Sequence, residues 1–275
     1  MTNSLFDKVV DLALRAGDAV LEVYNNGDGH PVETKGDNSP LTLADKRSHE
    51  IIATGLRELS PEIPILSEEG KTIPYENRRV WSTYWLVDPL DGTKEFISRN
   101  GEFTINIALM KDDRPVAGIV YAPVIDWLYY GSKGMGSFKR VGDGEPVSIR
   151  VDENFEAGIV AAQSRSHASP EEMEFLKQFS VVKTIQIGSS LKFCIIAEGK
   201  AHIYPRFGPM MEWDTAAGHA VVEEAGGIVR SWNGEFLRYN TESLKHRGMI
   251  VSSREVNIRP AIRDETPAPG RGSAQ

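Results

Sequence analysis

The chain has 275 residues, of which 40% are hydrophobic and 25% are charged, enough for one large domain or two closely joined ones. Its net charge of -8 argues against a protein that coats nucleic acid, because such a surface needs a basic face. The single cysteine, Cys194, excludes an internal disulfide framework, and no apolar run is long enough for an integral membrane segment. The expected compartment is the cytoplasm, and loose attachment to the cytoplasmic face of the inner membrane is left open.

The first half of the chain predicts two helices followed by a largely antiparallel sheet. Apolar residues at helical spacing predict an amphipathic helix over about residues 3–25, and a second helix, capped by Thr42, is expected over about 43–59. Residues 71–83 are expected to form a polar connection. Strands are predicted at 63–66, 85–87, 103–110, 115–121, 127–130, 136–139 and 147–151.

The second half alternates strands with helices, which implies helices packed on a sheet. Strands are predicted at 159–162, 183–187, 202–204, 228–231 and 249–252, and helices at 170–179, from Gly188-Ser189-Ser190 to about 197, and at 213–225. We expect an N-terminal half over residues 1–155, a C-terminal half over 156–258 and a disordered tail over 259–275. The tail is assigned by its composition, which is rich in Pro, Gly, Ser and Ala without periodicity.

The stretch from Trp85 to Thr93 places two acids, Asp88 and Asp91, at the end of a buried strand. Pro89 makes the turn rigid, and Gly92 lets a ligand approach the backbone. The N–H groups of a helix start attract an anion, whereas two acids at one tight turn repel each other unless a divalent cation neutralises them. The structural alternative is a plain Asp-Pro turn whose second Asp caps a helix.

Other acids also lie at the ends of predicted elements. Asp45 is in the first turn of a helix, Glu68 and Glu69 follow a strand, and Asp214 is at the start of a helix. The structural alternatives are compensation of the helix dipole at Asp45, a solvated turn at the two glutamates and a cap at Asp214. Oxygen ligands without a His or Cys cluster select Mg²⁺ or Mn²⁺ rather than Zn²⁺.

Two motifs, Trp85-Leu-Val-Asp-Pro-Leu-Asp-Gly-Thr93 and Trp213-Asp-Thr-Ala-Ala-Gly218, follow Leu66-Ser-Glu-Glu69 in the chain. Together they resemble the signatures of the Mg²⁺-dependent, lithium-sensitive phosphatases related to inositol monophosphatase, over roughly residues 3–255. Within that superfamily the chain is most similar to the bacterial 3'(2'),5'-bisphosphate nucleotidases of the CysQ type. This likeness lies in Asp37-Asn-Ser-Pro40, Lys94-Glu-Phe-Ile97, Arg99-Asn-Gly-Glu102, Ser164-Arg-Ser-His167, Gly188-Ser-Ser-Leu-Lys-Phe193 and Tyr204-Pro-Arg-Phe207.

The resemblance implies a mixed α and β fold, the layered αβαβα sandwich of the inositol monophosphatase and fructose-1,6-bisphosphatase type, with a metal site between its halves. Asp45 and Thr93 would form the relay that takes a proton from the attacking water, and Gly92, Thr93 and Asp214 would contact the substrate. Two or three Mg²⁺ ions, or Mn²⁺, would be held by Glu68, Asp88, Asp91, Asp214 and the carbonyl of Leu90.

A distal pocket for the nucleotide and its second phosphate is implied at His167, Ser189, Ser190, Lys192 and Arg206. A helix start that carries two hydroxyls and a Lys one turn later is a sensible cradle for an anion. For Lys192 and Arg206 the alternative is a solvated surface charge, and for His167 it is a loop histidine that caps backbone groups.

The implied activity is hydrolysis of the 3'-phosphate of adenosine 3',5'-bisphosphate to AMP and phosphate in sulfur assimilation, with the sulfated analogue as a further substrate. The partner would be a small-molecule nucleotide, and the enzyme a monomer or homodimer. One alternative is an inositol monophosphatase or related sugar phosphatase, which would have no need of a distal anion pocket. The other is a metal-dependent regulatory or binding protein on the same fold, which would have no need of a proton relay.

Overall fold

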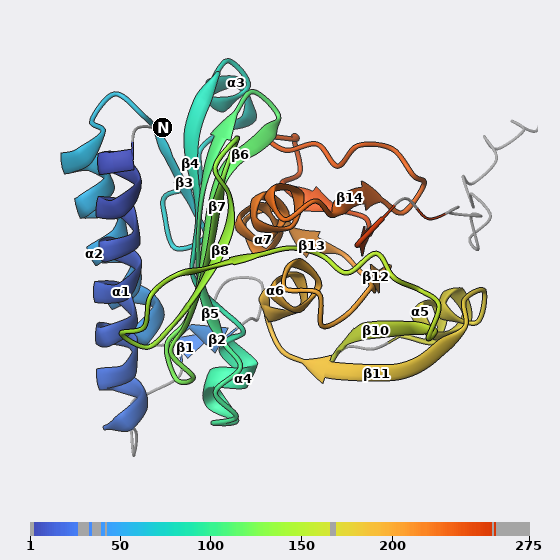
Figure 1. The fold of residues 1–275 in the computed structure, drawn as a ribbon. Coiled ribbons are helices and arrows are strands. Elements are labelled where there is room, and N and C mark those ends of the chain that lie inside the picture. The colour runs from blue at the N-terminus through green and yellow to red at the C-terminus, as the bar shows by residue number, and fades with distance from the viewer. Residues whose placement is uncertain are drawn as a thin grey trace, which may run out of the picture.

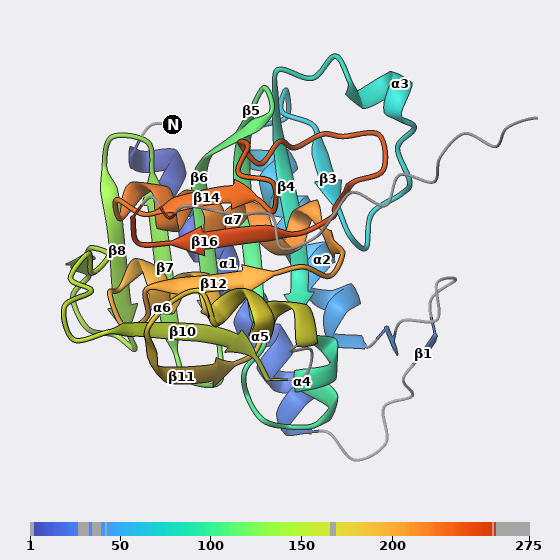
Figure 2. The same cartoon turned by 90° about the vertical axis from the view of Figure 1, so that its right-hand side faces the viewer.

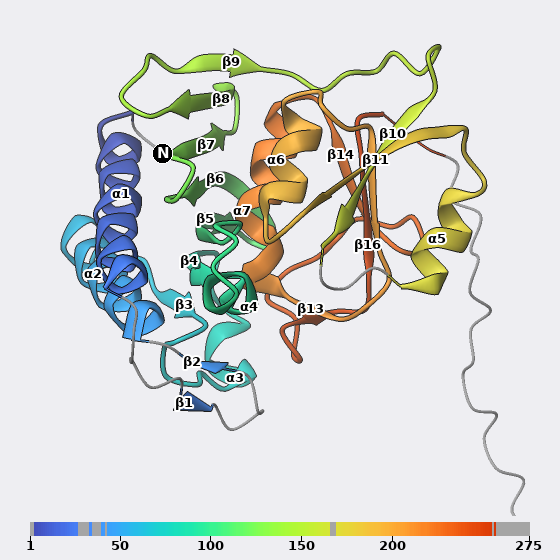
Figure 3. The ribbon, with the colours of Figure 1, turned by 90° about the horizontal axis from the view of Figure 1, so that it is seen from below.

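The computed structural model describes residues 3–26, 33–34, 40–41, 43–165, 169–254 and 256. These residues form five layers (Figure 1). Helices α1 (Asn3–Asn25) and α2 (Leu43–Leu59) cover one face of a large sheet, and α6 (Leu191–Ala197) and α7 (Glu212–Glu224) separate that sheet from a smaller one, whose far face carries α5 (Pro170–Leu176). The layers follow one another in the same order when the molecule is seen from below (Figure 3). The predicted αβαβα architecture is therefore confirmed.

The large sheet has seven strands in the order β3-β4-β5-β6-β7-β8-β9. Only β3 and β4 run parallel; every other neighbouring pair is antiparallel, as the run of hairpins predicts. The strands are β3 (Ile65–Ser67), β4 (Thr83–Asp91), β5 (Thr104–Lys111), β6 (Arg114–Ala122), β7 (Trp127–Ser132), β8 (Gly136–Val141) and β9 (Val147–Ile149).

Strand β4 is buried on both faces, which explains its continuous apolar run. Tyr84 and Leu86 belong to the core between the two sheets, whereas Trp85 and Val87 belong to the core under α1 and α2. The predicted end of this strand at Val87 was wrong, because pairing with β5 continues to Asp91. Asp88 pairs with Asn106, and Asp91 pairs with Thr104. Between these two pairs β4 has one residue more than β5. This is a β-bulge, a feature that redirects side chains at a strand end.

The small sheet has five strands in the order β11-β10-β12-β16-β14 (Figure 2). β10 is parallel to β11 and β12, whereas β16 is antiparallel to both of its neighbours. The strands are β10 (Ile159–Ser164), β11 (Val181–Ile187), β12 (Ile203–Arg206), β14 (Ile228–Ser231) and β16 (Met249–Ser252). Helix α5 ends three residues before its predicted end, and β11 begins two residues before its predicted start.

Several short elements were not predicted. Helix α3 (Tyr75–Arg78) lies within the expected polar connection. Two short strand pairs also form: β1 (Glu33–Thr34) with β2 (Pro40–Leu41), which are close in the chain, and β13 (Met210–Met211) with β15 (Lys245–His246), which are distant in it. Each of these elements is too short for its periodicity to be visible in the sequence.

Helix α7 holds the two predicted halves together. It belongs to the C-terminal half but packs across β5, β6 and β7 of the large sheet. A side chain at Gly118 of β6 would place its Cβ 2.2 Å from the carbonyl oxygen of Ala217, so only glycine permits this approach. The core between the sheets draws on both halves, and the domain boundaries at 155 and 258 stay predictions. The predicted tail over 259–275 lies outside the described residues.

Candidate active site

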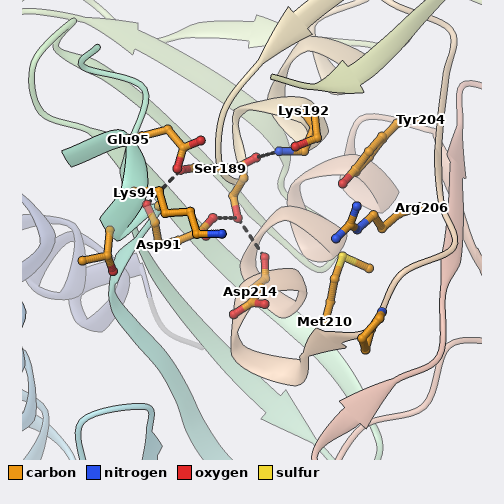
Figure 4. Close-up of a pocket in the computed structure, with 14 residues that line it drawn as sticks. Asp91, Lys94, Glu95, Ser189, Lys192, Tyr204, Arg206, Met210 and Asp214 are labelled. Atoms are coloured by element: carbon orange, nitrogen blue, oxygen red, sulfur yellow. Dashed lines mark hydrogen bonds between the residues drawn. The ribbon is translucent and has the colours of Figure 1, made fainter. Parts of the chain in front are cut away.

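A pocket of about 330 Å³ opens between the two halves (Figure 4). The bulge of β4 and helix α4 (Thr93–Ile97) form one wall, and the turn before α6, the end of β12 and the start of α7 form the other. Its lining consists mainly of polar and charged side chains: Asp91, Gly92, Thr93, Lys94, Glu95, Ser164, Ser189, Ser190, Lys192, Tyr204, Arg206, Pro209, Met210 and Asp214. A concave site with convergent polar groups is a typical binding site for a small molecule.

Four predicted acids from three distant stretches interact electrostatically beside this pocket. Burial raises the pKa of Asp88, and the charges of Glu68, Asp91 and Asp214 raise it further. Burial also raises the pKa of Asp214, again with added repulsion from Asp91 and Glu68. Proximity to the Glu68 carboxyl raises the pKa of Asp88 in addition. The acids therefore repel one another beside the pocket.

Asp91 has a more balanced environment than its neighbours. Burial raises its pKa, while the Lys192 ammonium and a hydrogen bond from Ser190 lower it. The hydroxyl of Ser190 lies 2.9 Å from Oδ2 of Asp91 and 2.8 Å from the carbonyl oxygen of Asp214, and it accepts a hydrogen bond from Nδ2 of Asn106 at 2.9 Å. Ser190 thus orients the Asp91 carboxylate between the two halves.

The acidic cluster fits a hard divalent cation. Its donors are all oxygens, and a cation would remove the repulsion that raises their pKa values. Within the described ranges, no group of three or more His, Cys, Asp or Glu side chains is placed so that it could hold a metal ion as it stands, so the support for a cation comes from the chemistry of the donors. The N–H of Leu90 donates to Oδ1 of Asp88 at 3.0 Å, which shapes the turn, and the assignment of the Leu90 carbonyl as a ligand stays a prediction.

Asp45 is only 2% exposed, which argues against a solvated acid that merely compensates the helix dipole. Ser48, one turn later on α2, donates its hydroxyl to the carbonyl of Pro89 at 2.7 Å. Residues three apart share a helix face, so Asp45 lies on the face that packs against the β4 bulge. Thr93 lines the pocket at the start of α4. Their predicted relay is consistent with this placement and stays a prediction.

Gly92 and Ser189 meet where the two walls touch. Gly92 has φ 92°, and a Cβ there would lie 2.1 Å from the Ser189 hydroxyl, so no other residue fits. Ser189 itself has φ 49°, a conformation that a serine rarely adopts. Its hydroxyl donates to the carbonyl of Asp91 at 2.8 Å.

Lys192 and Arg206 are not solvated surface charges. Lys192 is 7% exposed, donates from Nζ to the carbonyl of Ser189 at 2.6 Å and lies over the Tyr204 ring. Burial lowers its pKa, whereas Asp91 and Glu95 raise it. Arg206 is held by the buried carboxylate of Glu172 on α5, 3.3 Å from its Nη1. In Figure 4 both cations lie across the pocket from Asp91.

The structural alternative for Asp214, an N-cap, was wrong, because the N-cap of α7 is Met211; Asp214 is the third residue of the helix, and its Oδ2 accepts a hydrogen bond from the N–H of Met211 at 3.0 Å. A carboxylate that accepts this bond can still face the pocket with its other oxygen. His167 lies outside the described residues, so its predicted role stays untested.

Six lining residues were absent from the predicted site: Lys94, Glu95, Ser164, Tyr204, Pro209 and Met210. The first four lie within the segments that resemble the nucleotidases, and that likeness could have identified them. No feature of the sequence indicated Met210 as a site residue, because its place beside the pocket depends on the β13–β15 pair, which was not predicted.

The sequence matches the family model described as "Inositol monophosphatase family" over residues 3–265. It is 48% identical over 249 residues to the 3'(2'),5'-bisphosphate nucleotidase CysQ of Escherichia coli (strain K12), which covers 90% of this chain and 99% of the relative. The crystal structure of CysQ from Bacteroides thetaiotaomicron is 42% identical, with a TM-score of 0.79 and coverage of 90% and 97%. An inositol monophosphatase from Thermotoga maritima shares the fold at 24% identity, with a TM-score of 0.73 and coverage of 90% and 91%.

Proposed function

This chain belongs to the inositol monophosphatase family, and we propose that it is a 3'(2'),5'-bisphosphate nucleotidase that converts adenosine 3',5'-bisphosphate to AMP and phosphate. Enzymes of this family depend on metal ions. The observation that carries the proposal is a single pocket with an acidic cluster at one end and two cations, the buried Lys192 and the partly buried Arg206, at the other. A substrate with two separated phosphates would use both ends of this pocket, one for each phosphate.

At the acidic end, Glu68, Asp88, Asp91, Asp214 and the carbonyl of Leu90 would hold Mg²⁺ or Mn²⁺. The cation supplies positive charge that favours deprotonation of the attacking water and offsets charge on the leaving oxygen. Thr93 passes the proton of that water to the Asp45 carboxylate. The N–H groups of Gly92 and Thr93 bind the phosphate that is cleaved and keep it in line for attack.

At the opposite end, Lys192 and Arg206 bind the phosphate that is retained. Glu172 fixes the direction of the Arg206 guanidinium, so little conformational entropy is lost on binding. Tyr204, whose ring lies beside Lys192 at this end, and Met210 present an aromatic ring and a thioether to the pocket, a surface suited to a nucleoside. His167 is proposed to complete this end.

The deciding experiment measures phosphate release with Mg²⁺ from adenosine 3',5'-bisphosphate, inositol monophosphate and fructose bisphosphate in parallel. We expect kcat/KM for the adenosine bisphosphate to exceed the other two by at least about tenfold, in line with one charge-assisted contact to the second phosphate. Faster hydrolysis of inositol monophosphate would favour the sugar phosphatase. No release from any substrate would favour a binding protein.

The same preparation tests the remaining proposals. The sulfated analogue of the substrate is expected to lose its 3'-phosphate as well, which links the enzyme to sulfur assimilation. None of the helices in the described part of the chain has the length and apolar composition to cross a bilayer. We propose a cytoplasmic enzyme that is a monomer or homodimer, which light scattering would decide.

A further inference from the structure

Two charged residues beside the pocket have no role in the proposed reaction, yet they bind each other. Glu102 precedes β5, and Arg165 follows β10. Nε of Arg165 donates to Oε2 of Glu102 and Nη2 to Oε1, both at 2.7 Å, so the pair is bidentate. Glu102 and Arg165, which belong to two separate segments that resemble the nucleotidases, are therefore in contact.

This pair also holds the turn that leads into α6. Oε2 of Glu102 accepts the N–H of Gly188 at 2.8 Å, and Nη2 of Arg165 donates to the carbonyl of Gln186 at 3.0 Å. A Cβ at Gly188 would lie 2.7 Å from the carbonyl oxygen of Glu102, so the two backbones touch here. The pair thus fixes the chain immediately before Ser189.

The turn needs such support because Ser189 is in a strained backbone conformation, with φ 49°. Strain of this kind persists only where surrounding contacts determine it. The adjacent Ser190 carries the hydroxyl that orients Oδ2 of Asp91. A continuous path therefore runs from Arg165 through Glu102, Gly188 and Ser190 to a proposed metal ligand.

We infer that Glu102 and Arg165 are positioning residues, which hold the 188–190 turn so that Ser190 fixes the Asp91 carboxylate for the reaction. The inference rests on the proposed function. Side chains of Arg165 and Glu102 are 44% and 19% exposed, and such pairs add little to global stability. Their loss should therefore affect turnover more than folding.

The chain offers a matched control in Arg114 and Glu223, which are 2.5 Å apart and 32% and 28% exposed. This pair also joins the two halves, from β6 to α7, but it lies at the far end of α7 from Asp214 and does not contact the turn. Arg114→Ala therefore removes an ion pair between the halves without disturbing the proposed path.

The test compares Arg165→Ala, Glu102→Ala, the double variant and Arg114→Ala on adenosine 3',5'-bisphosphate with saturating Mg²⁺. We expect kcat to fall about tenfold in Glu102→Ala and about fivefold in Arg165→Ala, with KM within about twofold, because small displacements of reacting groups act on the chemical step. The double variant should be no slower than Glu102→Ala, since both residues act on one path. Arg114→Ala should stay within about twofold, and every variant should keep its Tm within about 4 °C.

Hydrogen exchange gives a readout that does not depend on turnover. In Glu102→Ala the Gly188 amide loses its acceptor and should exchange at least about tenfold faster, whereas Arg114→Ala should leave it unchanged. Two results would overturn the inference. One is a kcat of Arg165→Ala that equals that of Arg114→Ala, and the other is a Gly188 amide whose exchange rate does not change in Glu102→Ala. If the wild type releases no phosphate, the proposed function fails instead, and the exchange rates still decide whether the pair holds the turn.

Discussion

Glu212 and Asp214 lie two residues apart in the first turn of α7, and the difference between their surroundings distinguishes a structural acid from a proposed metal ligand. Glu212 is 0% exposed and accepts hydrogen bonds from the N–H of Asn240, the N–H of Thr241 and the hydroxyl of Thr241, at 2.6–2.8 Å. Burial raises its pKa, but these donors and the nearby Arg78 lower it. Asp214, by contrast, lies among other acids.

The contrast shows that the groups around a buried acid indicate its role. An acid surrounded by donors is already stabilised by the protein, and Arg78 completes that arrangement by donating to Asn240 at 2.7 Å and to the carbonyl of Glu242 at 2.9 Å. Acids that surround one another repel, and this repulsion destabilises the folded protein unless a bound cation offsets it. The following predictions test this contrast.

The largest effect is expected from Asp91→Asn. A neutral amide replaces a charged group in the acidic cluster, so kcat/KM at saturating Mg²⁺ should fall at least about a hundredfold on every substrate. The substitution also removes a repelling charge, so the Tm of the metal-free protein should not fall. Steady-state kinetics and thermal unfolding of the two proteins check both statements, and near wild-type turnover would remove Asp91 from the metal site.

Lys192→Ala should act on one substrate only. Loss of a charge-assisted contact to phosphate should lower kcat/KM for adenosine 3',5'-bisphosphate about ten- to a hundredfold and leave a simple monophosphate within about twofold. Equal losses on both substrates, with a lower Tm, would instead assign Lys192 to the support of the 188–190 turn through its bond to the Ser189 carbonyl. Kinetics on the two substrates distinguish these outcomes.

Glu212→Ala should reduce stability rather than chemistry. It leaves three partly buried donors without this acceptor, so the free energy of unfolding should fall by about 2 kcal/mol in urea titrations at neutral pH. Glu76→Ala is the control, because Glu76 is exposed and pairs only with Arg79 in the neighbouring turn. A stable Glu212→Ala protein that has lost as much activity as Asp91→Asn would abolish the proposed contrast between the two acids.

The smallest effect concerns the buried His246, whose ring is 5.0 Å from that of Tyr239. Burial, assisted by His219, lowers the pKa of His246 to about 4. The unfolded chain titrates near 6.5 and so binds more protons than the folded protein between these values. The stabilisation is therefore complete above pH 6.5 and is lost as the pH falls through 4.

His246→Phe should remove this dependence. The loss of unfolding free energy between pH 7 and pH 5 should shrink by about 1.5 kcal/mol relative to the wild type. Denaturant titrations at the two pH values measure it. An unaltered difference would show that His246 is protonated in the folded protein and that another group causes the acid sensitivity.

Most of the helices and strands could be predicted because long apolar patterns in the sequence mark them. The periodicity of α1 and the run from Trp85 to Val87 place their elements directly. The β-bulge between Asp88 and Asp91 was not visible, because it depends on the register with β5 rather than on β4 alone. The buried Arg78 was missed for a related reason: its partners lie more than 160 residues away, and its local sequence is polar.

The site was predicted in part by chemistry and in larger part by resemblance. Acids at element ends suggested a cation, but only the family motifs indicated that Glu68, Asp88 and Asp214 come together. The burial of Lys192 and Arg206 could not be decided from composition, since each is a charged residue beside apolar ones. Tertiary packing against Tyr204 and Glu172 decides it.

Strand β16 has a consequence for how the protein is made. It is the last strand of the described chain, yet it lies between β12 and β14, which the ribosome releases earlier. Until Met249–Ser252 has emerged, those two strands have no common neighbour, and the backbone of Arg206 lacks its pairing with Met249. A nascent chain stopped before Met249 can complete the seven-stranded sheet but not the cationic end of the pocket. We therefore expect phosphatase activity to appear during synthesis only when β16 has been added to the small sheet, and not already when the acidic cluster has folded.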